Sequence, residues 1–204
     1  MIIESSAPTR VDLAGGTIDI WPLYLFHPGA ATVNFAISLY ARCRIEERAD
    51  GVVYLESRDR QVAFASELAD IEQLEREERL ELISKLVHFF KPSVGFNLIA
   101  DCEAPAGAGL GGSSALAIAC IGALNHFVGR RYDESEFIDL APTSKQLLFV
   151  CRRDSGLLRA FYGGVNHLQF TIEGIKRTAL EIDEGARTPP RRVLHGRAAS
   201  FGHQ

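Results

Sequence analysis

The feature that most constrains the fold of this chain is a glycine-rich loop, residues 105–115, between an alternating apolar run and a long apolar helix. The loop reads PAGAGLGGSSA. Residues 96–102 before it alternate as a strand does, and residues 113–128 after it predict a helix that Gly129 closes. Glycines let backbone N–H groups approach an anion closely, and a helix N-terminus adds unpaired N–H groups and a positive dipole end. The pattern therefore predicts a phosphate-binding loop.

The loop has three other interpretations. One is a tight strand-to-helix turn with a serine N-cap, but four glycines lie within residues 107–112 and a serine pair follows, which favours phosphate binding. A Walker A loop requires a lysine, and the loop contains none. The glycines satisfy G-x-G-x-x-G, the dinucleotide pattern, which needs an acid at the end of a second strand about 20 residues later. Asp133 has that spacing but follows a polar connector, so the dinucleotide fold is disfavoured.

The remaining sequence predicts an α+β domain. Residues 31–45 and 51–56 are β-rich and are separated by a turn signal at residues 49–51. Apolar residues at helical spacing predict a helix over residues 70–90, which Lys91-Pro92 ends. Residues 164–170 and 175–182 predict a hairpin, and the acids from Asp133 onward predict the start of another helix. Strands first, then mixed strands and helices, are typical of the α+β class.

Composition indicates which kinds of partner and which cellular compartment to expect for this protein. The 204 residues are 47% hydrophobic and carry a net charge of −4, which predicts a globular domain with no nucleic-acid partner. No apolar run reaches the roughly 18 residues of a membrane span, and no signal peptide is evident, so we expect no membrane partner. The four cysteines are far apart in the sequence and form no CxxC pair, which is typical of buried thiols in a reducing cytoplasm.

Three segments resemble motifs of one enzyme family. The loop and its serines resemble the P-x-x-x-G-L-G-S-S-A signature of the GHMP kinases, the superfamily of galactokinase, homoserine, mevalonate and phosphomevalonate kinases. Residues 7–19, APTRVDLAGGTID, resemble the first motif of its sugar and heptose-phosphate kinases. Residues 161–166, FYGGVN, resemble the Y-G-G-x-N stretch that follows the family's catalytic region. Because the three matches occur in the family's order, the chain is identified as a member of this superfamily.

The resemblance implies a domain organisation. Residues 1–185 would form the GHMP kinase N-terminal, ATP-binding domain, an α+β fold like ribosomal protein S5 domain 2. The C-terminal ferredoxin-like domain would be largely missing, and residues 186–204 would form an aberrant basic tail where that domain begins. An apolar surface left uncovered at the domain interface would favour self-association.

The resemblance also implies a function, which is phosphoryl transfer from ATP, with Mg²⁺, to a hydroxyl of a small-molecule substrate. The form of the first motif favours a sugar or a sugar phosphate. The residues implied to bind the acceptor substrate are Arg10, Asp12, Gly15, Gly16 and Asp19. The residues implied to bind ATP are Pro105, Gly107, Gly109, Leu110, Gly111, Gly112, Ser113 and Ser114, of which Ser113 and Ser114 would also contact the metal.

One part of the chain departs from the family pattern. Sugar kinases of the family carry a catalytic aspartate in a G-x-Q-D-x-Y-like segment before Y-G-G, and here Gly156 stands at the corresponding position. Asp154 is two residues early and is the remaining candidate for that role. The stretch 142–159 also lacks the glutamate that helps to bind Mg²⁺ in the family.

The departure has two explanations, true divergence and a shifted reading frame. The codons CAG-GAC-TAC-TAC-GCG encode a family-like Gln-Asp-Tyr-Tyr-Ala, and in another phase the same bases encode Gly-Leu-Leu-Arg, which are residues 156–159. Residues 187–204, which are arginine-rich and free of acids, allow the same interpretation. On either explanation we expect a chain with impaired turnover, because losing a catalytic carboxylate costs orders of magnitude in rate. The alternative function is a non-catalytic protein that binds ATP or a sugar.

Overall fold

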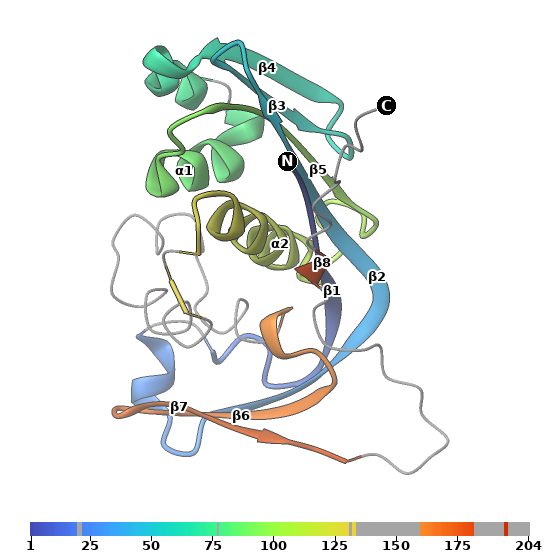
Figure 1. Ribbon diagram of the computed structural model, residues 1–204. Helices are drawn as coiled ribbons and strands as arrows, with labels where there is room; N and C mark the ends of the chain where they lie inside the picture. Colours follow the sequence, from blue (N-terminus) through green and yellow to red (C-terminus); the bar gives the residue numbers. More distant parts are fainter. Residues whose placement is uncertain (20–21, 77, 131, 134–159, 182–193, 196–204) are drawn as a thin grey trace.

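The longest element of the fold is the 18-residue strand β2 (Ala31–Arg48). The antiparallel strand β1 (Ile2–Ala14) pairs with most of its length. On its other side β2 changes neighbour, because residues 41–48 pair with β5 (Gly95–Cys102) and residues 31–35 pair with β6 (Val165–Thr171). The β1–β2 ribbon therefore connects two parts of one sheet, and Figure 1 shows it bending between them. The computed structural model describes residues 1–19, 22–76, 78–130, 132–133, 160–181 and 194–195.

The other strands extend these two parts. Strand β3 (Val52–Ser57) pairs in parallel with β5 and antiparallel with β4 (Val62–Glu67). Strand β7 (Gly174–Ala179) pairs with β6, and the short β8 (Leu194–His195) pairs with β1. The sheet order is β4-β3-β5-β2-β1-β8, with the β6–β7 hairpin beside the N-terminal part of β2. The predicted α+β class is confirmed.

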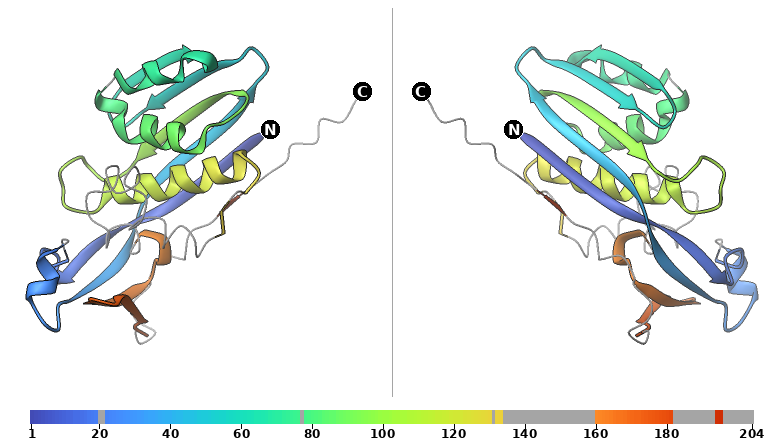
Figure 2. Two further views of the ribbon diagram at one scale, coloured as in Figure 1. Left: turned by 90° about the vertical axis from the view of Figure 1, so that its left-hand side faces the viewer. Right: turned by 90° about the vertical axis from the view of Figure 1, so that its right-hand side faces the viewer.

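Two helices, α1 (Glu81–Phe90) and α2 (Gly112–Phe127), cover one face of the sheet. Both views in Figure 2 place them on the same side of the strands. Helix α2 lies between α1 and the strands and is buried almost all round, so its sequence is apolar on every face rather than on one stripe. Burial of these helices against β1, β2, β3 and β5 makes the main core.

The predicted helix over residues 70–90 is wrong in its first half. A 3-10 segment, η2 (Leu68–Arg76), and a short turn, η3 (Glu78–Leu80), precede α1, and Asp70 has non-helical angles (φ −108°, ψ 30°). Residues 70–81 contain six acidic side chains and few apolar ones, so tertiary contacts determine the conformation of this half. The α1 helix ends as predicted, at Lys91 in the left-handed conformation before a proline.

Other predictions made from the sequence agree more closely with the structure. The predicted strands over 31–45, 51–56 and 96–102 are β2, β3 and β5, whereas β4 was not predicted. The predicted hairpin is β6–β7, and a second small core of Ala30, Leu168 and Phe170 packs beneath it with Tyr24. The helix predicted from Asp133 onward lies outside the described residues. Within the described part of the chain, no helix is both long enough and apolar enough to cross a membrane.

Candidate active site

The glycine-rich loop leads directly into α2. Gly111 is the N-cap and has a left-handed backbone (φ 70°), which glycine adopts without strain. The helix begins at Gly112, one residue before the predicted start, and no side chain caps it. The Ala115 N–H donates to the Gly111 carbonyl at 3.0 Å, as in a regular first turn. By helix geometry, the N–H groups of residues 112–114 have no partner inside the helix, and this is the arrangement that binds anions.

Arg10 of β1 holds the loop through its backbone and its side chain. Its N–H donates to the Leu110 carbonyl at 2.9 Å. Its guanidinium lies against Gly111 so closely that a Cβ there would come within 1.8 Å of Arg10 Nη1. Arg10 Nε donates to Asp12 Oδ1 at 3.3 Å, and the side chains of Arg10 and Asp12 are 7% and 20% exposed. The loop glycine and the buried arginine therefore fit each other.

The β1–β2 ladder is irregular around Arg10, whose N–H bonds to the loop. The register shifts between Pro8 and Arg10 and again between Asp12 and Ala14. At this break, Arg10 N–H bonds to the loop, while the Ala36 N–H of β2 donates to the Gly164 carbonyl at 2.8 Å. Register breaks redirect backbone groups and side chains and are frequent beside active sites. Here the break brings together the three segments 7–19, 105–115 and 161–166.

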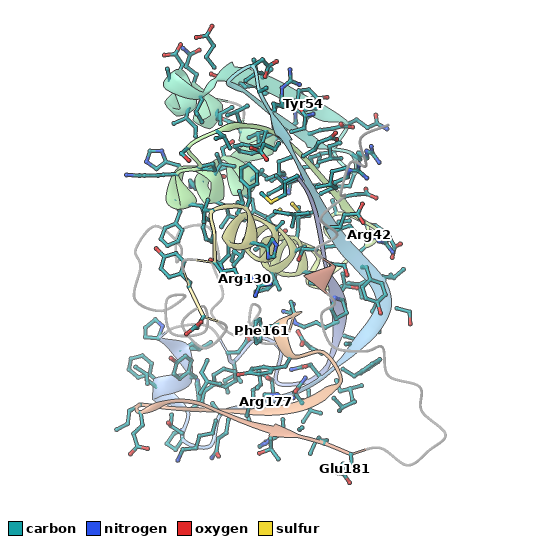
Figure 3. All side chains as sticks on the ribbon, in the orientation of Figure 1. Arg42, Tyr54, Arg130, Phe161, Arg177 and Glu181 are labelled. Atoms are coloured by element: carbon teal, nitrogen blue, oxygen red, sulfur yellow. The ribbon has the colours of Figure 1, made fainter. Side chains whose placement is uncertain are left out.

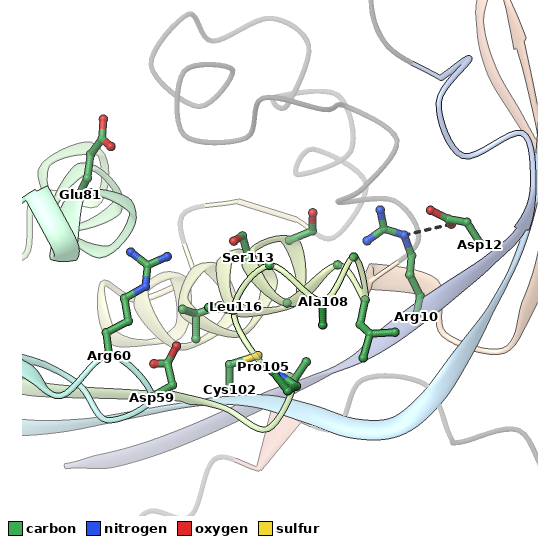
Figure 4. Close-up of a pocket in the computed structure, with 18 residues that line it drawn as sticks. Arg10, Asp12, Asp59, Arg60, Glu81, Cys102, Pro105, Ala108, Ser113 and Leu116 are labelled. Carbon is green, nitrogen blue, oxygen red and sulfur yellow. Dashed lines mark hydrogen bonds and ion pairs between the residues drawn. The ribbon is translucent and has the colours of Figure 1, made fainter.

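A cavity of about 600 Å³ lies over the loop and the first turn of α2. Arg10 and Asp12 stand at one end, and Asp59 and Arg60 of the β3–β4 turn stand at the other (Figure 4). The rest of the lining is the loop with its flanking residues and Glu81 of α1. All eight residues implied to bind ATP line this cavity: Pro105, Gly107, Gly109, Leu110, Gly111, Gly112, Ser113 and Ser114.

Asp59 and Arg60 were not predicted from the sequence. They lie about 50 residues before the loop and reach the cavity only because β3 and β5 are parallel neighbours. Ser57 Oγ donates to Asp59 Oδ1 at 2.7 Å, and Arg60 Nη1 donates to the Arg79 carbonyl at 3.0 Å, so both side chains are held in place. No local motif marks either residue.

Three of the residues implied to bind the acceptor do not line the cavity. Gly15 (φ 74°) and Gly16 form the turn after β1, where a Cβ on Gly15 would lie 2.0 Å from the Ala31 carbonyl oxygen. A Cβ on Gly16 would lie 3.0 Å from Asp12 Cβ, so this turn packs against the cavity wall. Asp19 is buried, 2% exposed.

A row of polar side chains continues from Asp12 across the sheet. Asp12 of β1 faces Asn34 of β2 in register, and Asn34 faces Asn166 of β6, so the three share one face. Arg177 of β7 lies 4.0 Å from the ring centre of Tyr162 and donates from Nε to Asn166 Oδ1 at 2.6 Å. Figure 3 shows Arg177 beneath the Phe161 segment. Asn34 and Asn166 are both 1% exposed.

Two ionisable groups near the loop have shifted pKa values. Burial raises the pKa of the Cys102 thiol, which lines the cavity, so this thiol stays neutral. The Tyr40 N–H, which donates at 2.6 Å, and the Arg42 guanidinium lower the pKa of Glu103, which comes just before the loop. Glu103 therefore links the start of the loop to β2 through these hydrogen bonds.

Hydroxyl groups are the metal-ligand candidates at this cavity. Mg²⁺ is commonly held by one or two protein oxygens together with substrate phosphates and water. The Ser113 and Ser114 hydroxyls in the first turn of α2 fit such a role. In the described ranges, no group of three or more His, Cys, Asp or Glu side chains could hold a metal. Asp154 and the stretches 142–159 and 186–204 lie outside the described residues.

These features define an α+β domain whose strand, glycine-rich turn and helix N-terminus line one cavity. Residues 65–150 match the family model of the GHMP kinases N terminal domain. Over this segment, which is less than half of the chain, the sequence is similar to the GHMP kinases.

Two relatives of the chain are sugar or sugar-phosphate kinases. The chain is 29% identical over 174 residues to the D-glycero-alpha-D-manno-heptose 7-phosphate kinase of Campylobacter jejuni, covering 82% of this chain and 50% of that protein. It is 27% identical over 214 aligned positions to the L-fucokinase/L-fucose-1-P guanylyltransferase of Bacteroides fragilis, covering 93% of this chain and 21% of that protein. The chain thus spans at most half the length of these curated relatives.

A solved structure supports the fold. The D-glycero-D-manno-heptose 1-phosphate kinase from Bacteroides thetaiotaomicron superposes with a TM-score of 0.73 at 27% identity. The match covers 89% of this chain and 60% of that one. The fold implied by the sequence resemblance is therefore confirmed for the described residues.

Proposed function

We propose that this chain binds ATP with Mg²⁺ and takes part in transferring the γ-phosphoryl group to a hydroxyl of a sugar or sugar phosphate. The observation that carries the proposal is the contact of Arg10 with the loop. Its N–H bonds to Leu110, and its guanidinium packs on Gly111, so an acceptor beside Arg10 and Asp12 would lie next to phosphates on the loop. Phosphoryl transfer depends mainly on such positioning and on electrostatic stabilisation.

The roles of the residues follow from their chemistry. The N–H groups of residues 111–114, at the start of α2, would bind the ATP phosphates, and Ser113 and Ser114 would contribute ligands to Mg²⁺. The Arg10 guanidinium would attract the negative charge of a phosphate, while Asp12 would accept a hydrogen bond from an acceptor hydroxyl. Gly15, Gly16 and Asp19 would shape the turn behind them. Names of the relatives, a heptose-phosphate kinase and a fucokinase, support a sugar acceptor.

We also propose that residues 1–185 form the N-terminal kinase domain and that residues 186–204 form an aberrant tail. We propose further that the protein is cytoplasmic and that its partner is its small-molecule substrate.

A second candidate function is binding of ATP or sugar without catalysis. The replacement of the family's aspartate by Gly156 favours it. In that case Asp154 would contribute nothing to turnover.

The first experiment is calorimetric titration of the full chain with ATP and Mg²⁺. We expect saturable binding that weakens about tenfold or more in Arg10→Gln, since a charge-assisted contact to phosphate is lost. Arg44→Gln is the matched control, because Arg44 is 45% exposed and pairs with Glu4 on the sheet. Absence of ATP binding in the unaltered chain would refute the proposal.

The second experiment separates catalysis from binding. ADP release is measured with galactose, fucose and heptose 7-phosphate as acceptors, in the unaltered chain and in Asp154→Asn. Turnover that is lost in Asp154→Asn assigns the base to Asp154, and ATP binding without turnover on any acceptor supports the non-catalytic alternative. Sequencing the DNA of codons 140–204 decides between divergence and a shifted reading frame.

A further inference from the structure

The side-chain amide of Asn34 is a buried donor on the strand next to the cavity-lining residue Asp12. Asn34 is 1% exposed, and its Nδ2 has no hydrogen-bond partner among the described residues. Buried polar groups in folded proteins nearly always have partners, so each exception calls for a reason. Asn34 lies on β2 directly across from Asp12, which lines the cavity, and Cβ atoms of such cross-strand pairs are about 5 Å apart.

The orientation of this amide is set by its neighbours. Arg177 Nε donates to Asn166 Oδ1 at 2.6 Å, which fixes the oxygen of Asn166. Asn166 Nδ2 then donates to the Gly163 carbonyl at 2.8 Å and to Asn34 Oδ1 at 3.5 Å. Asn34 therefore turns its oxygen to β6 and keeps Nδ2 as a donor directed away from Asn166.

The chemistry of the row identifies a ligand class. A carboxylate such as Asp12 only accepts hydrogen bonds, whereas a sugar hydroxyl both donates and accepts, and a phosphate oxygen accepts. A donor placed next to Asp12 supplies what the carboxylate cannot. The pair can therefore accept a hydrogen bond from an oxygen-rich ligand through Asp12 and donate one to it through Asn34.

We propose that Asn34 is a specificity-determining residue for the phosphoryl acceptor, and that its Nδ2 donates to a hydroxyl or phosphate oxygen of that acceptor. Asn166 and Arg177 act as positioning residues that hold the amide in the required orientation. This inference rests on the proposed function, because it requires an acceptor beside Asp12. It goes beyond that function by assigning the recognition to a residue outside the three motif segments.

The test uses the full chain, saturated with ATP and Mg²⁺, and two probes, galactose and D-glycero-α-D-manno-heptose 7-phosphate. Nuclear magnetic resonance follows the side-chain NH₂ resonances of Asn34. These resonances are assigned through their correlation with the Asn34 Cβ, so the assignment needs no variant. We expect the resonance to shift on addition of at least one probe and to stay unmoved by ATP. A shift with galactose indicates a hydroxyl partner, and a shift only with the heptose phosphate indicates a phosphate oxygen.

Calorimetry with variants supplies the second readout. Asn34→Ala should weaken acceptor binding about tenfold, the effect of one lost hydrogen bond, while ATP affinity stays within about twofold. Asn166→Asp, which keeps the acceptor for Arg177 but loses the donor to Asn34, should give a smaller loss. Asn97→Ala is the matched control, since Asn97 on β5 accepts from Arg48 outside the site, and it should change neither affinity.

The outcomes separate the two proposals. Acceptor binding that leaves the Asn34 amide unmoved, or that is equal in Asn34→Ala, overturns the role of Asn34 and leaves the proposed function standing. ATP binding without binding of either probe overturns the role of Asn34 as well. Failure of the unaltered chain to bind ATP overturns the proposed function and this inference together.

Discussion

The two ends of the β1–β2 ribbon use the same pair of strands in opposite ways. At one end the register is regular, and the facing pairs Ile3–Ile45, Ser5–Cys43 and Ala7–Ala41 lie buried beneath the helices. At the other end the register shifts twice, and the facing pairs are Arg10–Ala36 and Asp12–Asn34. The regular end contributes apolar burial, whereas the irregular end presents polar groups to the cavity.

This difference shows where stability and function are located. Apolar pairs under a helix stabilise the domain through buried area and require only the period-2 pattern. The buried Asn34 Nδ2 has no hydrogen-bond partner among the described residues, which costs free energy, so its presence indicates a use other than stability. We expect substitutions at the regular end to change unfolding and substitutions at the irregular end to change ligand binding.

The largest expected effect is at the regular end. Ile45→Ala should lower the free energy of unfolding by about 2–5 kcal/mol, because a fully buried side chain leaves a cavity. Chemical denaturation measures the change. Ile172→Ala, at an 87% exposed isoleucine in the β6–β7 turn, is the control and should stay within about 0.5 kcal/mol. Equal effects of the two substitutions would contradict the assignment of the core.

The next effect is at the irregular end. Gly111→Ala should weaken ATP binding about 100-fold, or ~2.7 kcal/mol, because the new Cβ displaces the Arg10 guanidinium and the loop with it. Gly107→Ala is the matched control for Gly111→Ala, because Gly107 has a similar φ of 79° but open space around its Cβ position. Its loss should be much smaller. Calorimetry that gives both variants the same affinity would mean that the contact with Arg10 is unimportant for ATP.

The smallest effect is at the junction of the two ends. The Tyr40 N–H and Arg42 lower the pKa of Glu103 in the folded chain, so the ionised carboxylate stabilises the fold at pH values above the ordinary glutamate pKa of about 4.3. That contribution is lost as the pH falls through the lower, folded-state pKa. Glu103→Gln should therefore be less stable than the unaltered chain at pH 7, and the difference should shrink as the pH falls below the ordinary glutamate pKa. Thermal unfolding over this pH range measures the difference, and a pH-independent difference would contradict the prediction.

Sequence reasoning succeeded where local patterns determine the structure. Alternation predicted β2, β3, β5 and the β6–β7 hairpin, and glycine spacing predicted the loop, because these depend on neighbours in the chain. The prediction failed for residues 70–80, where acidic residues leave the conformation to tertiary contacts. It also missed β4, in which only Val62 is buried.

The candidate site was predictable in part for the same reason. Motif resemblance identified Arg10, Asp12 and the loop, and the structure places them around one cavity. Asp59 and Arg60 carry no local signal and reach the cavity through strand pairing. The register breaks of β1 likewise follow from pairing with β2 and from the competing bonds to Leu110 and Gly164, which no single segment encodes.

The central claim is that the loop and Arg10 form one site for ATP phosphates, and backbone amide resonances of the full, ¹⁵N-labelled chain test it most directly. On titration with ATP and Mg²⁺, we expect saturable shifts that are largest for residues 109–114, with a shift at the Arg10 amide, whose bond to Leu110 couples it to the loop. Amides of the β6–β7 turn should stay unmoved. Saturable shifts that leave residues 109–114 unchanged, or no shifts at all, would contradict the account.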